Sequence, residues 1–204
     1  GPDAGEGWSG LSCGHVASLT VRDTAAFLDA SHGAEAGAPY HAPVPAGPFL
    51  AEASADPGRL RIAFSSAAPN GVAVDAECVA AVADTAKLLA ELGHEVAEAA
   101  PEYDFAEAMA HMAVIWAANT WTNTALRYQT LGREPDGSGL ENITWAIARR
   151  GREATAADYA RALQVVHALG RTFAAFHDTW DVFVTPTLAQ PPVPLGNIDM
   201  MATD

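Results

Sequence analysis

A strand, a helix and a second strand follow one another in the first half of the chain, and this order restricts the fold more than any other feature. Residues 59–66 (RLRIAFSS) are typical of a strand, and a Pro-Asn-Gly turn at 69–71 follows it. Asp75 is a suitable N-cap for a helix to about Leu92, and residues 94–100 then return as a short strand. Two strands joined in this way pair in parallel through a right-handed crossover, so the sequence predicts an α/β fold.

The helix of this unit has apolar residues at helical spacing, which indicates a face turned toward the core. We expect five of its side chains to be buried: Val79, Val82, Leu88, Leu89 and Leu92. Gly93 is placed to end the helix, because a left-handed residue commonly follows the last turn and glycine adopts that conformation without strain.

Four further helices are expected. Thr20 with Asp23 resembles a capping box and opens a helix that ends at Gly33, and Thr155 with Asp158 opens another that runs to about His177. The other two cover residues 104–131 and 141–150. Between the first of these helices and the strand at 59–66, the segment 34–57 is rich in alanine, glycine and proline, which favours a long surface connection.

A third strand is predicted at residues 181–188 (DVFVTPTL), where contiguous apolar residues indicate burial on both faces. Pro186 removes a backbone donor, so the strand should end there or lie at a sheet edge. Three strands are few for this much apolar material, since half of the residues are hydrophobic. We therefore expect open sheet edges that favour pairing with another segment or self-association.

Charge and composition exclude several classes of partner. The net charge is −14, from 25 acidic and 11 basic residues, and the clustered lysines and arginines that contact phosphates are missing. Nucleic acid and anionic membranes are therefore not expected as partners. No apolar run approaches the roughly 20 residues that span a bilayer. Cys13 and Cys78 form no Cys-x-x-Cys pair, so a reducing cytoplasm is the expected location.

Three segments of the chain resemble the amidase-signature family. They are LTVRDTAAFLDASHG at 19–33, the strand and helix at 59–66 and 74–96 (VDAECVAAVADTAKLLAELGHEV), and DVFVTPTLAQPPVP at 181–194. Their order and spacing are similar to those of the family, and the opening GPDAGEGWSGLS is most similar to bacterial amidases near the cyclic-dimer nylon-oligomer hydrolases. The resemblance implies a mixed sheet flanked by helices, incomplete in this chain, with residues 1–204 as a single partial domain.

The resemblance also implies an activity that these residues do not carry by themselves. Family members hydrolyse amides with a serine, a second serine in a cis peptide and a lysine, through an acyl-serine intermediate and without a metal or cofactor. The family places this triad before the region that the chain resembles. The only lysine, Lys87, lies in the helix after Asp75 without a serine-rich motif, so no catalytic residue is assigned. We expect a parent amidase acting on a small-molecule amide, and a chain that is inactive alone.

An alternative is a non-catalytic partner subunit or binding module that completes a separate catalytic chain. Under either hypothesis, the candidate substrate-binding residues are Trp116, Asn119, Thr120 and Asn123, which share one helix face at spacings of three, four and seven. Amides and hydroxyls on an otherwise apolar helix need polar partners if they are buried, and an amide substrate or other backbone could supply them. Trp8, in the opening loop, is the fifth candidate. No histidine pair has zinc-binding spacing, so no metal is expected.

Overall fold

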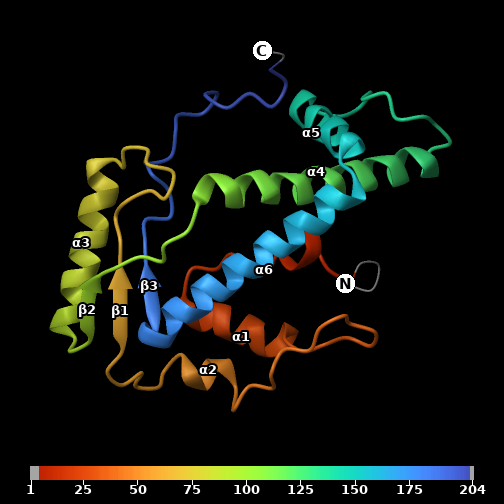
Figure 1. Ribbon diagram of the computed structural model, residues 1–204. Coiled ribbons are helices and arrows are strands. Elements are labelled where there is room, and N and C mark those ends of the chain that lie inside the picture. The colour runs from red at the N-terminus through yellow and green to blue at the C-terminus, as the bar shows by residue number, and fades with distance from the viewer. Residues whose placement is uncertain (1–4, 203–204) are drawn as a thin grey trace. The chain divides into compact units, whose positions relative to one another are not determined.

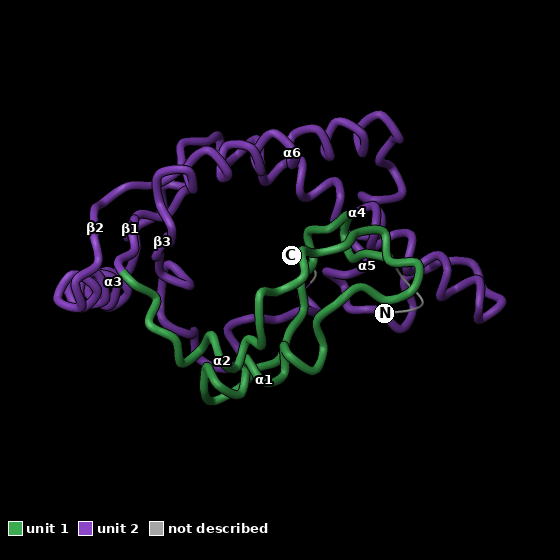
Figure 2. Tube along the Cα trace, turned by 90° about the horizontal axis from the view of Figure 1, so that it is seen from below, with its two compact units in different colours: residues 1–58 green, residues 59–204 purple. Residues whose placement is uncertain are grey.

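The computed structural model describes residues 5–202, which fall into two compact units divided between Gly58 and Arg59 (Figure 2). The first four residues of the opening segment used for the resemblance above lie outside the described residues. Each unit is described separately below. The expectation that residues 1–204 form a single partial domain stays a prediction.

The first unit holds a short 3-10 helix, η1 (Trp8–Gly10), and two α-helices, α1 (Val21–Ser31) and α2 (Phe49–Glu52). The helix start predicted at Thr20 is confirmed, because the Thr20 hydroxyl oxygen accepts a hydrogen bond from the Asp23 N–H at 3.1 Å. The one-turn helix α2 lies inside the segment that was expected to be a plain surface connection. It is tied to α1 by the Asp29 carboxylate, which accepts hydrogen bonds from the backbone N–H groups of Phe49 and Leu50.

The second unit contains a three-stranded sheet in the order β2-β1-β3 (Figure 1). The strands are β1 (Arg61–Phe64), β2 (Glu95–Glu98) and β3 (Val182–Val184), and β1 pairs in parallel with both neighbours. The predicted parallel strand–helix–strand unit is therefore confirmed, with α3 (Ala76–Glu91) as its helix. Within the described residues β3 lies at the edge of the sheet and ends before Pro186, as the sequence predicts.

Helix α3 begins and ends where the sequence places its caps. The Asp75 carboxylate accepts a hydrogen bond from the Glu77 N–H at 2.8 Å, and Gly93 adopts a φ of +96° after the last turn. A side chain with a Cβ would be strained at that φ, which explains the glycine.

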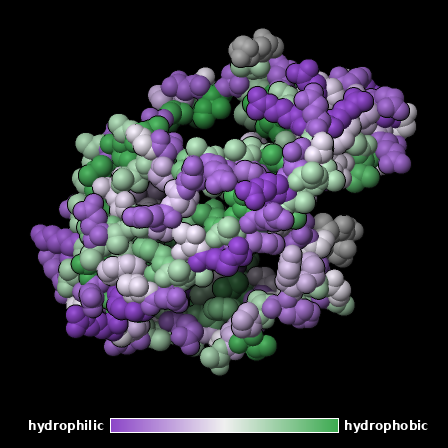
Figure 3. Space-filling model, in the orientation of Figure 1, coloured by the Kyte–Doolittle hydropathy of each residue, from purple (hydrophilic) through white to green (hydrophobic). Residues whose placement is uncertain are grey.

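The burial expected for α3 is partly wrong. Val82 is buried and Leu89 is half-buried, but Val79, Leu88 and Leu92 are 38%, 54% and 65% exposed. A helix buries only the stripe that faces a packed neighbour, and α3 packs against β2 of a narrow sheet. Figure 3 shows hydrophobic residues reaching the surface among hydrophilic ones, including at the left, where Figure 1 places α3.

The remaining helices of the second unit are α4 (Phe105–Thr130), α5 (Asn142–Glu153) and α6 (Ala156–Thr179). Both α5 and α6 pack against the long helix α4 (Figure 1). The capping box predicted at the start of α6 is confirmed: the Thr155 hydroxyl oxygen accepts from the Asp158 N–H, and the Asp158 carboxylate accepts from the Thr155 N–H.

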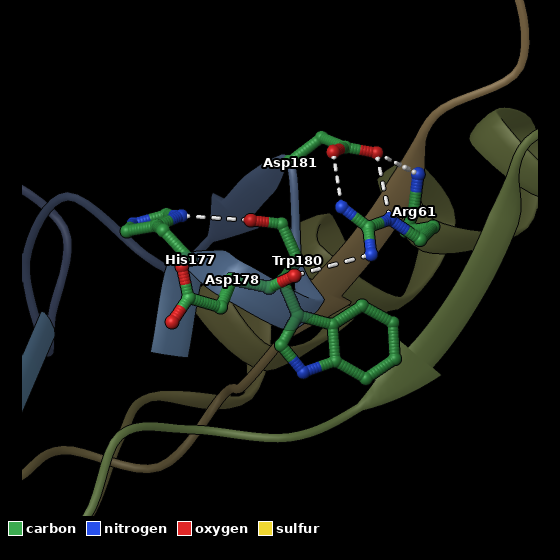
Figure 4. Close-up of polar contacts among 5 residues, drawn as sticks. All are labelled: Arg61, His177, Asp178, Trp180 and Asp181. Carbon is green, nitrogen blue, oxygen red and sulfur yellow. Dashed lines mark hydrogen bonds and ion pairs between the residues drawn. The ribbon is translucent and has the colours of Figure 1, made fainter. Parts of the chain in front are cut away.

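A polar clamp joins the end of α6 to the amino ends of β1 and β3 (Figure 4). The Arg61 guanidinium donates two hydrogen bonds to the Asp181 carboxylate, at 2.7 and 3.2 Å, and one to the Asp178 carbonyl at 3.3 Å. The Asp181 carboxylate also accepts the Arg61 backbone N–H at 2.7 Å, and His177 bonds the Trp180 carbonyl through its ring nitrogen. The clamp links β1 to β3 at the amino ends of the strands, opposite the carboxyl ends.

This clamp makes stability depend on pH in acid. Hydrogen bonds from Arg61, first from its side chain and then from its backbone, lower the pKa of Asp181 from 3.8 to about 2. A carboxyl whose folded pKa is depressed stabilises the fold above its unfolded pKa, and that contribution is lost as pH falls from there through the folded value. We expect Asp181→Asn to lower the urea midpoint at neutral pH. The difference in urea midpoint between the wild type and the variant should become smaller as the pH falls from about 4 to about 2. A difference in urea midpoint that stays constant over this pH range would contradict the assignment of the pH dependence to Asp181.

Candidate functional site at the carboxyl ends of the strands

A pocket with a volume of about 800 Å³ lies at the carboxyl ends of the three parallel strands. Ser65 directly follows β1, Ala100 and Pro101 lie just after β2, and Thr185 follows β3, and all four line it. Strand β1 connects through α3 to β2 on one side, while β3 lies on its other side. Open parallel sheets bind ligands beyond their carboxyl ends at such a reversal of strand order, so this carboxyl-end pocket is the primary candidate site.

One wall of the carboxyl-end pocket is aromatic. Tyr103 lies beside Phe173 of α6, with ring centroids 5.6 Å apart, and beside Phe105 at the start of α4, at 6.4 Å. Phe183 of β3 contributes another ring, held edge to face by Phe176 at 5.2 Å. The polar groups around these rings come from the segments that follow the strands: Ser65, Asn70, Glu102, Thr185 and Thr187. An apolar wall with a few polar groups is the usual composition of a small-molecule pocket.

Ser65 is not equipped to act as a nucleophile. It is buried, and its hydroxyl oxygen accepts a hydrogen bond from the Ala67 N–H at 3.2 Å, which is a local turn contact. A serine nucleophile needs an adjacent base to remove its proton. Among the described residues that line the carboxyl-end pocket there is no lysine or histidine. The polar contacts of Ser65 are therefore structural.

Lys87 is equally unsuited to the role of a catalytic base. Its side chain is 76% exposed on α3, and its ammonium group pairs with Glu91 at 3.9 Å, one turn along the same helix. A lysine that activates a serine must lie within hydrogen-bonding distance of it, in a site that excludes water. The absence of a catalytic residue from these 204 residues stays a prediction.

The four candidate residues on α4 share a helix face, as predicted, but they do not line the carboxyl-end pocket. The Asn119 amide donates to the Ile115 carbonyl at 2.9 Å and to the Tyr159 hydroxyl of α6 at 3.5 Å, and the Thr120 hydroxyl donates to the Trp116 carbonyl at 2.8 Å. Trp116 is 44% exposed and Asn123 is exposed. The backbone of α4 thus supplies hydrogen-bond partners for Asn119 and Thr120. A role in substrate binding stays a prediction for all four residues.

Trp8 belongs to the first unit, so its position relative to α4 is not described. Trp8 and Ser9 have positive φ values of 49° and 56°, and the turn is closed by a hydrogen bond from the Gly10 N–H to the Gly7 carbonyl at 3.1 Å. Residues other than glycine rarely adopt this conformation, and it is often retained for function. Trp8 is 41% exposed, which leaves part of its ring accessible, and its assignment as a binding residue stays a prediction.

Neither a metal-binding cluster nor a membrane-spanning helix is found among residues 5–202. No group of three or more histidine, cysteine, aspartate or glutamate residues in this range is placed to hold a metal ion. None of the helices in the same range combines the length and apolar character required to cross a bilayer.

The profile of the family described as Amidase matches residues 6–203, which is nearly the whole chain. The chain belongs to the Amidase family. The match runs through both units and includes every strand around the carboxyl-end pocket. The resemblance to the amidase-signature family drawn from three sequence segments is therefore confirmed, and so is the α/β fold class that it implied.

Known relatives agree with this assignment but are much longer. The chain is 27% identical over 187 residues to 6-aminohexanoate-cyclic-dimer hydrolase of Paenarthrobacter ureafaciens, which covers 88% of the chain and 37% of that protein. It is 28% identical to acylamidase of Rhodococcus erythropolis, covering 86% of the chain and 36% of the relative. The solved structure of 6-aminohexanoate cyclic dimer hydrolase superposes with a TM-score of 0.80 at 26% identity, over 90% of the chain and 39% of that structure. The chain thus spans somewhat more than a third of these relatives.

The sequence analysis missed the aromatic wall, although one signal was available. Tyr103 and Phe105 come three and five residues after the strand predicted at 94–100, and Thr185 and Thr187 lie at the end of another predicted strand. Because parallel strands bring such segments to one sheet edge, their meeting could have been inferred. Phe173 could not, since it reaches the pocket through the packing of α6.

Proposed function

We propose that this chain serves in the hydrolysis of carboxylic amides, as the part of an amidase domain that flanks the substrate cleft. The observation that carries the proposal is the Amidase match over residues 6–203. The proposed substrate is a small-molecule amide, supported by the names of the two hydrolases to which the chain is similar. Anionic polymers are disfavoured as substrates by the net charge of −14.

The proposed chemistry is acyl transfer to a serine that lies outside these 204 residues. A base removes the serine proton as the serine oxygen attacks the amide carbonyl, and backbone N–H groups hold the oxyanion. The protonated base then gives this proton to the amine, which leaves as the C–N bond breaks. Water then hydrolyses the acyl-serine ester and releases the acid. This cycle needs no metal or organic cofactor. The placements of Ser65 and Lys87 support the assignment of these steps to another segment.

A second candidate function is a non-catalytic subunit that completes a separate catalytic chain. It is favoured by Leu88 and Leu92, two exposed apolar side chains one turn apart that form the α3 face, because covering apolar surface with a partner is favourable. The partner would be the catalytic part of an amidase domain or a second copy of the chain. Cytoplasmic location is proposed for either function, supported by free cysteines at positions 13 and 78.

Amide hydrolysis can be measured for two proteins: the 204-residue chain and the full-length natural protein that contains it. With a panel of alkyl and aryl anilides, we expect turnover and covalent labelling by a serine-directed fluorophosphonate only in the full-length protein. Turnover or labelling of the chain alone would contradict the proposal. A full-length protein that hydrolyses none of the amides would also contradict it. Activity that appears when a separate amidase chain is added would favour the second candidate.

A further inference from the structure

The carboxyl-end pocket carries a single type of charge. Among the described residues that line it, Glu102 is the only aspartate or glutamate, and none is a lysine, an arginine or a histidine. Glu102 is exposed and follows Pro101, directly before Tyr103 of the aromatic wall. A carboxylate beside aromatic rings attracts cations, both by direct charge and through the faces of the rings.

The other polar groups of the pocket are neutral. Thr185 and Thr187 flank Pro186 beyond β3, and Asn70 lies in the turn after β1. Their hydroxyl and amide groups can donate or accept hydrogen bonds, so they suit the N–H groups and the carbonyl of an amide. They cannot neutralise a carboxylate, because that needs a lysine, an arginine or a metal ion. The lining therefore accepts amines and amides and disfavours acids.

We propose that the carboxyl-end pocket binds the apolar body of an amine or an uncharged amide, with the nitrogen toward Glu102, and discriminates against the corresponding carboxylic acid. The proposal rests on the proposed function, because it assigns the pocket to the amine-derived half of an amide substrate. Its volume of about 800 Å³ is within the range of roughly 300–1,000 Å³ that small-molecule sites occupy. The four aromatic rings provide the apolar contact, which favours phenylalkyl or long alkyl chains.

Three ligands with one skeleton separate charge from apolar contact: 3-phenylpropylamine, 3-phenylpropanamide and 3-phenylpropanoate. We expect the amine to bind the 204-residue chain about two- to fivefold more tightly than the amide, which corresponds to about 0.4–1 kcal/mol and is within the range for an exposed ion pair. The acid should bind more weakly than the amide. Dissociation constants can be obtained by titration calorimetry or ligand-observed NMR, at low salt and again at high salt, where the preference for the amine should shrink.

Two variants locate the charge effect. Glu102→Gln should reduce the affinity for the amine to about that for the amide, a loss of about two- to fivefold, and leave the amide unchanged. Glu98→Gln is the matched control, because Glu98 is an exposed glutamate at the end of β2 that does not line the pocket. It changes the net charge equally, so it should leave both affinities at their wild-type values.

Several results would overturn the proposal. They are equal binding of the acid and the amine, no saturable binding of either the amine or the amide, and an amine affinity that Glu102→Gln leaves unchanged. Loss of ligand binding in the full-length protein would show that another segment fills the pocket. That result would also overturn the proposal. Binding needs no turnover, so amide hydrolysis without binding would reject this inference alone. Binding without hydrolysis in the full-length protein would instead reject the proposed function.

Discussion

Replacing Gly151 by alanine should lower the free energy of unfolding of the second unit by about 1–2 kcal/mol. Gly151 is buried in α5 where this helix crosses α4, and a Cβ at that position would lie 1.8 Å from the Ala117 carbonyl oxygen. Backbone cannot rotate away as a side chain can, so the helices must separate. Overpacking of this kind costs about 1–3 kcal/mol or more, and the better helix propensity of alanine returns at most about 1 kcal/mol.

Gly170→Ala is the matched control for this substitution. Gly170 is an exposed residue inside α6, and a Cβ there would have no heavy atom within 4 Å. Alanine should therefore stabilise the protein by up to about 1 kcal/mol through helix propensity and the lower entropy of the unfolded chain. Urea denaturation followed by circular dichroism gives both values. Equal effects of the two substitutions would show that α4 and α5 do not approach as closely as Gly151 requires.

The features that the sequence predicted well depend on neighbouring residues along the chain. The caps at Thr20, Asp75 and Thr155 need only a side chain and the backbone N–H groups two or three residues further on. The parallel pairing of β1 with β2 follows from the length of the α3 crossover. The approach of Gly151 to Ala117 is different, because it depends on which helix packs beside α5, and no local pattern encodes that choice.

Burial on α3 and the position of the candidate site also depend on packing between elements, which local sequence patterns do not encode. A helical apolar pattern identifies a face but does not say whether a neighbour covers all of it, so Leu88 and Leu92 were expected inside and lie outside. The polar residues of α4 were singled out for their chemistry, yet the helix itself satisfies Asn119 and Thr120. The chain spans only 37–39% of its cyclic-dimer hydrolase relatives.

Ile62→Ala should be the most destabilising side-chain truncation in the sheet. Ile62 lies in the central strand, where it is in register with Val96 of β2 and Val182 of β3, and it is 2% exposed. Truncation removes apolar contacts on a strand that is hydrogen-bonded on both sides, and a fully buried isoleucine-to-alanine change costs about 2–5 kcal/mol. The same urea titration, performed on the variant and the wild type, measures the loss.

Leu92→Ala is the informative comparison for Ile62→Ala, because both remove a large aliphatic side chain beside the same sheet. Leu92 is 65% exposed, so its truncation should change stability by no more than about 0.5 kcal/mol in a monomer. A loss in free energy of unfolding near that of Ile62→Ala would mean that the α3 face, formed by Leu88 and Leu92, is covered in solution. If that loss of stability rose with protein concentration, the partner that covers the face would be a second copy of the chain, since only association makes stability depend on concentration. A small cost at every concentration would leave the α3 face free for the rest of an amidase domain.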